Sequence, residues 1–160
     1  MHRPWLTPGC IASLWLVTIA ISVAADPPAP ALTNSQSLSF GRFAAGNGGS
    51  VTLSPAGART PGGNVVLLTS GPGTSAQFSV TGNVSAVYSI TLPSDGTVFL
   101  TRSGAAPMAV NQFTSSPSGA GLVLSGTGQQ PVSVGATLSV GAGATAGSYA
   151  GTFFVTVDYP

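Results

Sequence analysis

Short stretches in which apolar and polar residues alternate recur along this chain, and clusters of Gly, Pro, Ser and Asn separate them. In Ala76–Thr81 and in Tyr88–Leu92 every second residue is apolar, which is the period of a β-strand with one buried face. No stretch keeps the 3.6-residue apolar period of an amphipathic helix. About nine or ten short strands at this spacing are typical of a two-sheet sandwich. The sequence therefore predicts an all-β protein with an Ig-like two-sheet β-sandwich.

The remaining strands are expected between the turn-forming clusters, and one of them has a different pattern. Residues 65–68 are Val-Val-Leu-Leu, which predicts a strand covered on both faces, with an exposed contact surface as the alternative. A break is expected near Gly135, inside one long candidate strand. The further strand predictions are 37–43, 50–53, 64–69, 98–101, 108–114, 121–125 and 129–140.

The C-terminal segment has the most regular pattern. From Gly147 to Tyr159 the odd positions are mostly aromatic or β-branched, and the even positions are mostly small or polar. This alternation predicts one long final strand with a single face directed to the core. Phe154 is the exception on the polar face, and it is interpreted either as a partly covered aromatic or as a contact with a neighbouring subunit.

The N-terminus has the pattern of an export signal. The apolar run Cys10–Val23 is shorter than a membrane span of about 20 residues, and Val23-Ala24-Ala25 offers small residues for cleavage. We therefore expect residues 1–25 to be a signal peptide removed before Asp26, with an uncleaved membrane anchor as the alternative. Residues 26–36 form a Pro-rich N-terminal extension, and residues 37–160 are expected to form the sandwich domain.

The chain after Ala25 has little reactive chemistry, because it contains no His, Cys, Lys, Glu or Trp. General acid–base, thiol, Schiff-base and metal chemistry lack their usual residues, so the sequence predicts no enzyme, no catalytic residue, no cofactor and no metal site. Charged residues make up 4% of the chain, against about 25% in a typical soluble domain. This composition argues against nucleic acid as a partner and favours association with other protein subunits. The charged residues after Ala25 are Arg42, Arg59, Arg102, Asp26, Asp95 and Asp158.

Several sequence blocks form a recognisable set when they are taken in order. They are Leu38–Gly41, Gly49–Pro55, Ala76–Gly82, Tyr88–Pro93, Val132–Leu138 and Ala146–Phe153. Together these blocks resemble the secreted bacterial domains described as Mat/Ecp fimbriae major-subunit-like, a family that is mostly of unknown function. The resemblance covers nearly all of residues 38–160, and it implies a pilin-type β-sandwich and a fimbrial context.

The C-terminus also resembles that of chaperone–usher pilins. Such pilins end in an alternating strand with a penultimate aromatic residue, here Tyr159, and a glycine fourteen residues from the end, here Gly147. The resemblance implies export to the periplasm and then the surface of a Gram-negative cell, with a periplasmic chaperone, an outer-membrane usher and neighbouring fimbrial subunits as partners, and no membrane contact after signal cleavage. It also implies that the chaperone and later the subunit core contact one strand, through Gly147, Tyr149, Phe153, Val155, Val157 and Tyr159.

Two interpretations of the N-terminal extension remain open. In chaperone–usher pilins the extension of one subunit adds a strand to the next, and the candidate donor side chains here are Leu32, Leu38 and Phe40. Three prolines at positions 27, 28 and 30 remove N–H donors from this segment. The alternative is a flexible tether before a self-complete, monomeric secreted sandwich that acts as an adhesin or ligand-binding module.

Overall fold

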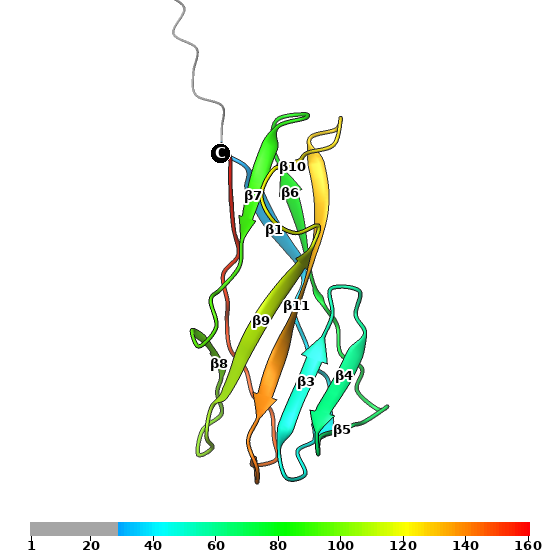
Figure 1. Ribbon diagram of the computed structural model, residues 1–160, viewed down its shortest axis with the longest axis vertical. Helices are drawn as coiled ribbons and strands as arrows, with labels where there is room; N and C mark the ends of the chain where they lie inside the picture. Colours follow the sequence, from blue (N-terminus) through cyan, green and yellow to red (C-terminus); the bar gives the residue numbers. More distant parts are fainter. Residues whose placement is uncertain (1–28) are drawn as a thin grey trace, which may run out of the picture.

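The computed structural model describes residues 29–160, and the predicted signal peptide and the start of the Pro-rich extension lie outside the described residues. The described chain folds into strands and loops, with no helix among these residues. The strands form an elongated sandwich (Figure 1). The prediction of an all-β sandwich is therefore confirmed.

The long strand β11 (Gln129–Val140) is the centre of the larger sheet. Along one edge it pairs first with β6 (Ala76–Thr81) and then with β3 (Gly49–Leu53), both antiparallel. Along the other edge it pairs with β9 (Met108–Ser116). One strand thus joins the two ends of the molecule, as Figure 1 shows.

The change of partner from β6 to β3 takes place at Gly135. A Cβ atom at this position would collide with the carbonyl oxygen of Leu53, so glycine is what allows the two backbones to approach. The expected break near Gly135 is wrong, because β11 is continuous through this residue. The irregularity is instead a shift of register against β9 between Gly135 and Thr137.

Three outer strands complete the larger sheet. β1 (Ala31–Gln36) pairs with β6, β4 (Arg59–Gly63) with β3, and β8 (Val98–Leu100) with β9. The sheet therefore begins at Ala31, inside residues 26–36, which were predicted to precede the sandwich domain. The sequence of β4, Arg-Thr-Pro-Gly-Gly, has no alternating pattern, and its pairing with β3 was not predicted.

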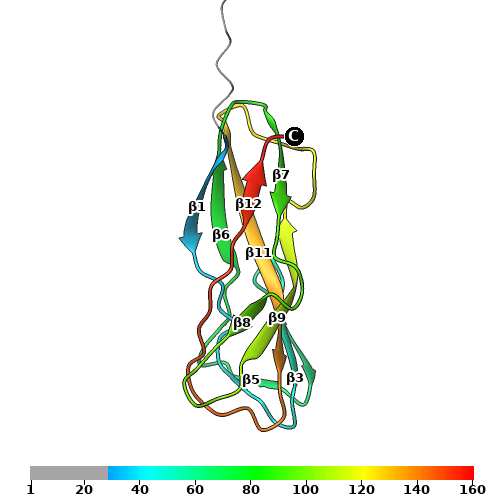
Figure 2. The same cartoon turned by 90° about the vertical axis from the view of Figure 1, so that its left-hand side faces the viewer.

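The second layer is smaller. β7 (Val87–Thr91) lies between β10 (Leu122–Val123) and β12 (Thr156–Asp158). A separate ribbon of β2 (Phe43–Ala44) and β5 (Val66–Leu67) lies near the opposite end of the molecule from β12. Figure 2 shows that the chain leading to β12 runs along one side of the sandwich without forming a ladder over most of its length.

The core has two clusters, one at each end. Tyr88 and Val80 lie in the cluster beside β12, and Leu53 and Leu138 lie in the cluster at the other end. All four are almost completely buried, as the alternating patterns of β6 and β7 predicted for Val80 and Tyr88. The side chains that pack against both clusters are Leu38, Phe113 and Phe153.

Two predicted strands differ from the structure. Residues 37–42 form only a single bridge, from Ser39 to Thr74, and Phe43 belongs to the short strand β2. Gly41 bends the chain between them with a φ of 71°. In residues 65–68, Val65 is 5% exposed but Val66 is 58% exposed. The prediction of a strand buried on both faces is therefore wrong, and the ribbon presents an exposed apolar face.

Candidate interaction groove

The C-terminal segment is held at only a few points along its length. Ala150 exchanges two backbone hydrogen bonds with Thr101, at 2.8 and 3.0 Å, and three residues of β12 pair with β7. The remainder of the segment from Gly147 is not in a ladder. The prediction of one continuous final strand is thus correct for β12 and wrong for most of the residues before it.

The side chains of this segment nevertheless alternate as the sequence predicted. Tyr149 and Phe153 pack against the core, and the Phe153 ring lies 6.4 Å from that of Phe78 and 5.1 Å from that of Phe113, centroid to centroid. Phe154 points outward and is 84% exposed. The predicted contact-strand residues that pack against the cluster beside β12, or belong to it, are Phe153, Val155, Val157 and Tyr159.

The N-terminal segment lies opposite and also uses only one of its edges. The Ser39 N–H donates to the Thr74 carbonyl oxygen, and the Ser39 carbonyl oxygen accepts from the Thr74 N–H, at 2.8 Å each. In an antiparallel pair the next groups along the chain point the other way, so the N–H of Phe40 and the C=O of Leu38 point away from Thr74. On the other segment, Ala150 pairs with Thr101, which directly follows β8. The N–H of the next residue, Gly151, therefore points away from β8.

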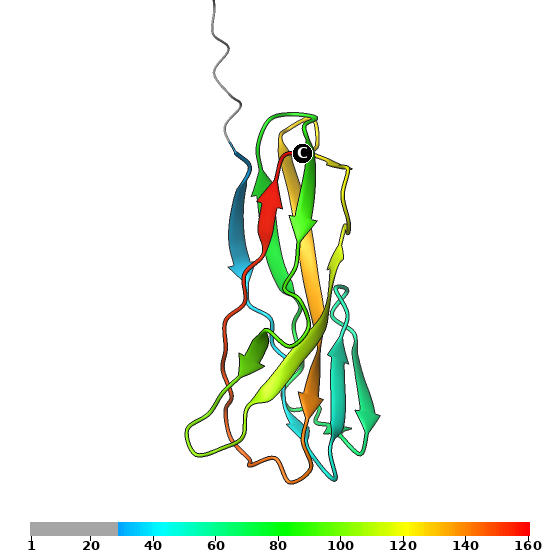
Figure 3. The same cartoon turned by 60° about the vertical axis from the view of Figure 1, so that its left-hand side comes forward.

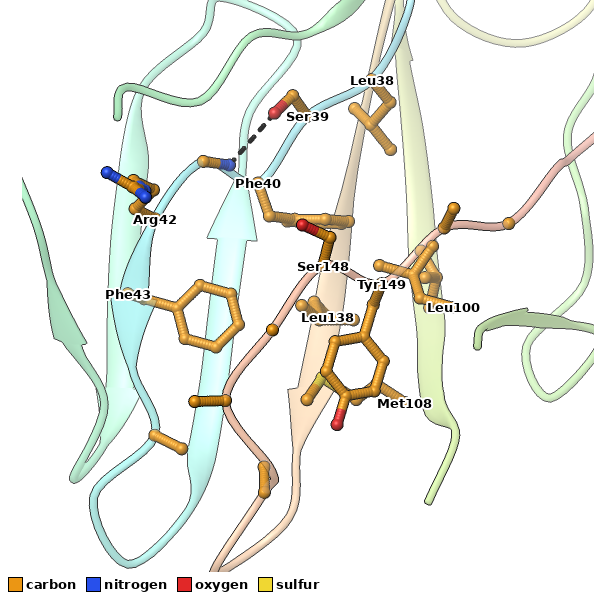
Figure 4. Close-up of a pocket in the computed structure, with 18 of the residues that line it drawn as sticks. Leu38, Ser39, Phe40, Arg42, Phe43, Leu100, Met108, Leu138, Ser148 and Tyr149 are labelled. Atoms are coloured by element: carbon orange, nitrogen blue, oxygen red, sulfur yellow. Dashed lines mark hydrogen bonds between the residues drawn. The ribbon is translucent and has the colours of Figure 1, made fainter. Parts of the chain in front are cut away.

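An apolar groove lies between these two segments at the lower end of the molecule. Its volume is about 900 Å³, and Figure 4 shows aromatic and aliphatic side chains directed into it from both segments and from the sheet behind. Arg42 is the charged residue among those that line it. The larger apolar lining residues include Phe40, Phe43, Leu100, Met108, Leu138 and Tyr149.

The groove exists because residues with small side chains line its two walls. A Cβ atom at Gly147 would collide with the Arg102 guanidinium, and a Cβ atom at Gly151 would collide with the Phe99 carbonyl oxygen. Neither glycine can therefore be replaced without displacing a neighbour. Side chains that end at Cβ leave the centre of the groove unfilled. The small lining residues are Gly41, Ala44, Ala45, Ala144, Ala146, Gly147, Ala150 and Gly151.

Above the groove, β1 and β12 approach each other without pairing. Figure 3 shows the two strands side by side, yet each is the end strand of its own sheet and they are not paired with each other. We call the whole strip, between residues 31–45 and residues 144–159, the seam. Cα atoms of β1 and β12 come within 8 Å of each other, which is less than the roughly 9.6 Å of two strand spacings. An added strand therefore has room only in the lower part of the seam, in the groove. Along the seam, the sandwich has two strand edges that face each other without a ladder between them.

Two other sheet edges, β4 and β10, are less suited to accept a strand. β4 carries Pro61, which lacks an N–H, and β10 is only two residues long. Proline and short length are the means by which natural sheets protect their edges. Unlike β4 and β10, the seam offers both backbone groups and apolar surface.

The structure places the candidate donor side chains within their own domain. Leu32 packs against the cluster beside β12, and Leu38 packs against both clusters. Phe40 is 6% exposed and belongs to the lower cluster. These three residues lie along one wall of the seam, and the predicted contact strand forms the other wall, so the fold brings the two sets together.

Two titratable side chains, those of Arg42 and Tyr149, line the groove. Burial raises the pKa of Tyr88, whose hydroxyl has no hydrogen-bond partner among the described residues. Within residues 29–160, no three His, Cys, Asp or Glu side chains lie close enough to hold a metal ion. No helix in this part of the chain is long and apolar enough to cross a membrane. What the groove offers a partner is apolar surface and peptide groups.

A family model described as Domain of unknown function (DUF4402) matches residues 31–159. The chain belongs to this family. The DUF4402 match begins at the first residue of β1 and ends just after β12, so it coincides with the sandwich of the structure. No curated protein and no solved structure matches the chain. The Mat/Ecp resemblance therefore stays a prediction.

Proposed function

We propose that the protein is a structural subunit of a bacterial surface fimbria, or a closely pilin-like surface protein, whose sandwich is completed by β-strand addition. The observation that carries this proposal is the seam, where an apolar groove of about 900 Å³ lies between two unpaired strand edges. An extended segment placed in the seam would hydrogen-bond to backbone on either side. Its alternate side chains would fill the groove.

The energetics favour such a partner over water. Each apolar side chain that leaves water and fills the groove contributes about 1.5–3 kcal/mol. The N–H groups of Phe40 and Gly151, which point away from the strands beside them, would gain ladder bonds, each contributing about 1 kcal/mol. Register would be fixed by which side chains of the incoming strand face the groove, since a slip of one residue turns all of them outward.

The proposal gives the predicted contact strand a physical role. Tyr149 and Phe153 form one wall of the groove, and the residues through Tyr159 continue this wall along the seam. In the pilin-like interpretation, a periplasmic chaperone occupies the seam first and a strand of another subunit replaces it at an outer-membrane usher. The mature protein is then part of a surface fimbria.

The state of the protein on the cell surface tests the proposal. Surface fibres sheared from the producing bacterium should contain the chain in SDS-resistant multimers that fall apart to monomer on heating, because added strands of this kind dissociate slowly. A chain found only as a monomer in unheated samples would overturn the proposal and favour the secreted adhesin or ligand-binding module.

A matched pair of variants ties this result to the groove. Ala146 is exposed and lines the groove, so Ala146→Phe fills the space where a strand would lie. Ala120 is exposed in the loop between β9 and β10, outside the groove. Multimers should be lost in Ala146→Phe and retained in Ala120→Phe.

A further inference from the structure

The N-terminal segment is part of the sandwich, and this limits what it can do in an assembly. β1 pairs with β6 through five residue pairs, from Ala31 with Thr81 to Gln36 with Gln77. Three side chains of β1 add hydrogen bonds to backbone carbonyls of β6 or of Ser75, directly before it. They are Asn34 Nδ2 and Ser35 Oγ to the Gln77 carbonyl, and Gln36 Nε2 to the Ser75 carbonyl, each at 3.2 Å.

The apolar residues that follow are also committed to the chain's own core. Leu38 packs against both clusters, and Phe40 is 6% exposed within the lower one. A strand that left to fill a neighbouring subunit would remove one wall of its own groove. The structure therefore favours a first strand that stays in its own domain.

The sequence directly before β1 cannot replace it as a donor. Positions 27, 28 and 30 are proline, and proline has no N–H for a ladder and is excluded from central strands. A strand placed in the seam lies between two others and needs donors on both edges. Apart from the prolines, positions 26–30 contain only Asp26 and Ala29, so this stretch has no large apolar side chain to place in the groove.

From these two observations we infer that the seam is filled by a strand from a different polypeptide, and that this chain accepts a strand without donating one. It would then stand at one end of an assembly instead of repeating along it. The inference rests on the proposed function and names the partner of the same groove. That partner is an extended segment with alternating apolar side chains and no charge on the inward face, because the larger side chains that line the groove are apolar.

Peptide binding to the exported protein, purified from the periplasm of a host that expresses the full chain, tests the inference. The acceptor probe is a peptide of about ten residues, a usual strand length, that alternates Val with Thr and carries Lys at its ends. The same peptide with a central Pro is its control, since it loses one ladder donor. The second probe is a peptide of residues 26–36 of this chain.

We expect the alternating peptide to raise the melting temperature and form a one-to-one complex. The Pro control should bind at least about tenfold more weakly, a difference that corresponds to one lost contact of about 1.4 kcal/mol. The peptide of residues 26–36 should not bind, and the protein alone should stay monomeric at high concentration. Ala146→Phe should lose the complex and Ala120→Phe should keep it.

The outcomes separate the inference from the proposed function. If the protein alone forms multimers, or if the peptide of residues 26–36 binds as tightly as the alternating peptide, the chain donates its own first strand and the inference is overturned while strand addition stands. If no peptide binds the wild-type protein, the groove is not an acceptor and both proposals fail. Peptides are preferable to deleting residues 26–36, because that deletion would remove β1 from the sheet.

Discussion

The hydroxyl of Tyr159 accepts a hydrogen bond from the backbone N–H of Asn83, at 2.8 Å. This contact ties the penultimate residue of the chain to the turn that follows β6. Gly82 lies directly against the same hydroxyl, where a Cβ atom would collide with the Tyr159 oxygen. The wall of the seam formed by the C-terminal segment is thus fixed at its end by one hydrogen bond and one close approach.

Two substitutions should separate these contributions. Tyr159→Phe removes the hydrogen bond and should lower the free energy of unfolding by about 1 kcal/mol. Gly82→Ala forces the ring away and should cost more, about 2 kcal/mol, as expected for overpacking. Urea unfolding followed by circular dichroism measures both. Equal stability of wild type and Gly82→Ala would show that the ring moves aside freely.

Arg59 holds the irregular N-terminal segment against the ribbon of β2 and β5. Its guanidinium donates to the carbonyl oxygens of Phe40 and Arg42, at 3.2 Å each, and of Leu68, at 3.1 Å. Arg59→Met keeps the aliphatic stem but loses all three bonds, so we expect a loss of about 2 kcal/mol in the free energy of unfolding. Arg42→Met is the matched control, since the Arg42 side chain is exposed. Thermal unfolding of the two variants checks the difference, and equal melting temperatures would contradict the role of Arg59.

The strands that the sequence predicted well are those with clear alternation. β6 and β11 have the predicted bounds, β7 is shifted by one residue at both ends, and β3 begins one residue earlier than predicted. These strands have an apolar face against the core and a polar face outside, so the period of two is imposed by burial. The signal for the contact wall at Tyr149 and Phe153 has the same origin.

The missed elements lack that signal for physical reasons. β4 lies at an edge and is Arg-Thr-Pro-Gly-Gly, so its pairing comes from the neighbouring β3 and not from its own side chains. The residues before β12 alternate in polarity, so the sequence predicted a continuous strand there. No strand of the described residues lies beside them on the seam side, and most of them form no ladder. The groove itself was not predicted, because it arises from small residues on segments that are about 100 positions apart in sequence and are brought together only by the fold.

The buried hydroxyl of Tyr88 predicts a pH dependence of stability. Burial raises the pKa of this phenol above its ordinary value of about 10. Below pH of about 10 the phenol is protonated in both folded and unfolded chains, so it adds no pH dependence there. Above that value the unfolded chain releases the proton first, so stability falls as the pH rises through the folded pKa. Urea midpoints measured between neutral pH and about pH 11 should show this fall in the wild type.

Tyr88→Phe is the control for that measurement. The wild-type hydroxyl is buried without a hydrogen-bond partner, so its removal breaks no bond and spares its desolvation. We expect Tyr88→Phe to be at least as stable as the wild type at neutral pH and to lose part of the decline at high pH. A loss of more than about 1 kcal/mol at neutral pH would show that the hydroxyl has a partner in solution.

Phe153 and Phe154 are adjacent in sequence but point to opposite sides of the C-terminal segment. Phe153 packs between the Phe78 and Phe113 rings, and Phe154 is 84% exposed. Phe153→Ala should therefore lower the free energy of unfolding by about 2–3 kcal/mol, since the ring is half-buried. Phe154→Ala should change it by less than about 0.5 kcal/mol.

The same pair distinguishes folding from assembly. If the exposed ring contacts a neighbouring subunit, Phe154→Ala should reduce the multimers recovered from the cell surface while the melting temperature of the monomer stays the same. If multimer yield and monomer stability are both unchanged, the ring is an ordinary exposed aromatic. Because the two variants remove the same side chain from neighbouring positions, any difference between them reflects the face on which each ring lies.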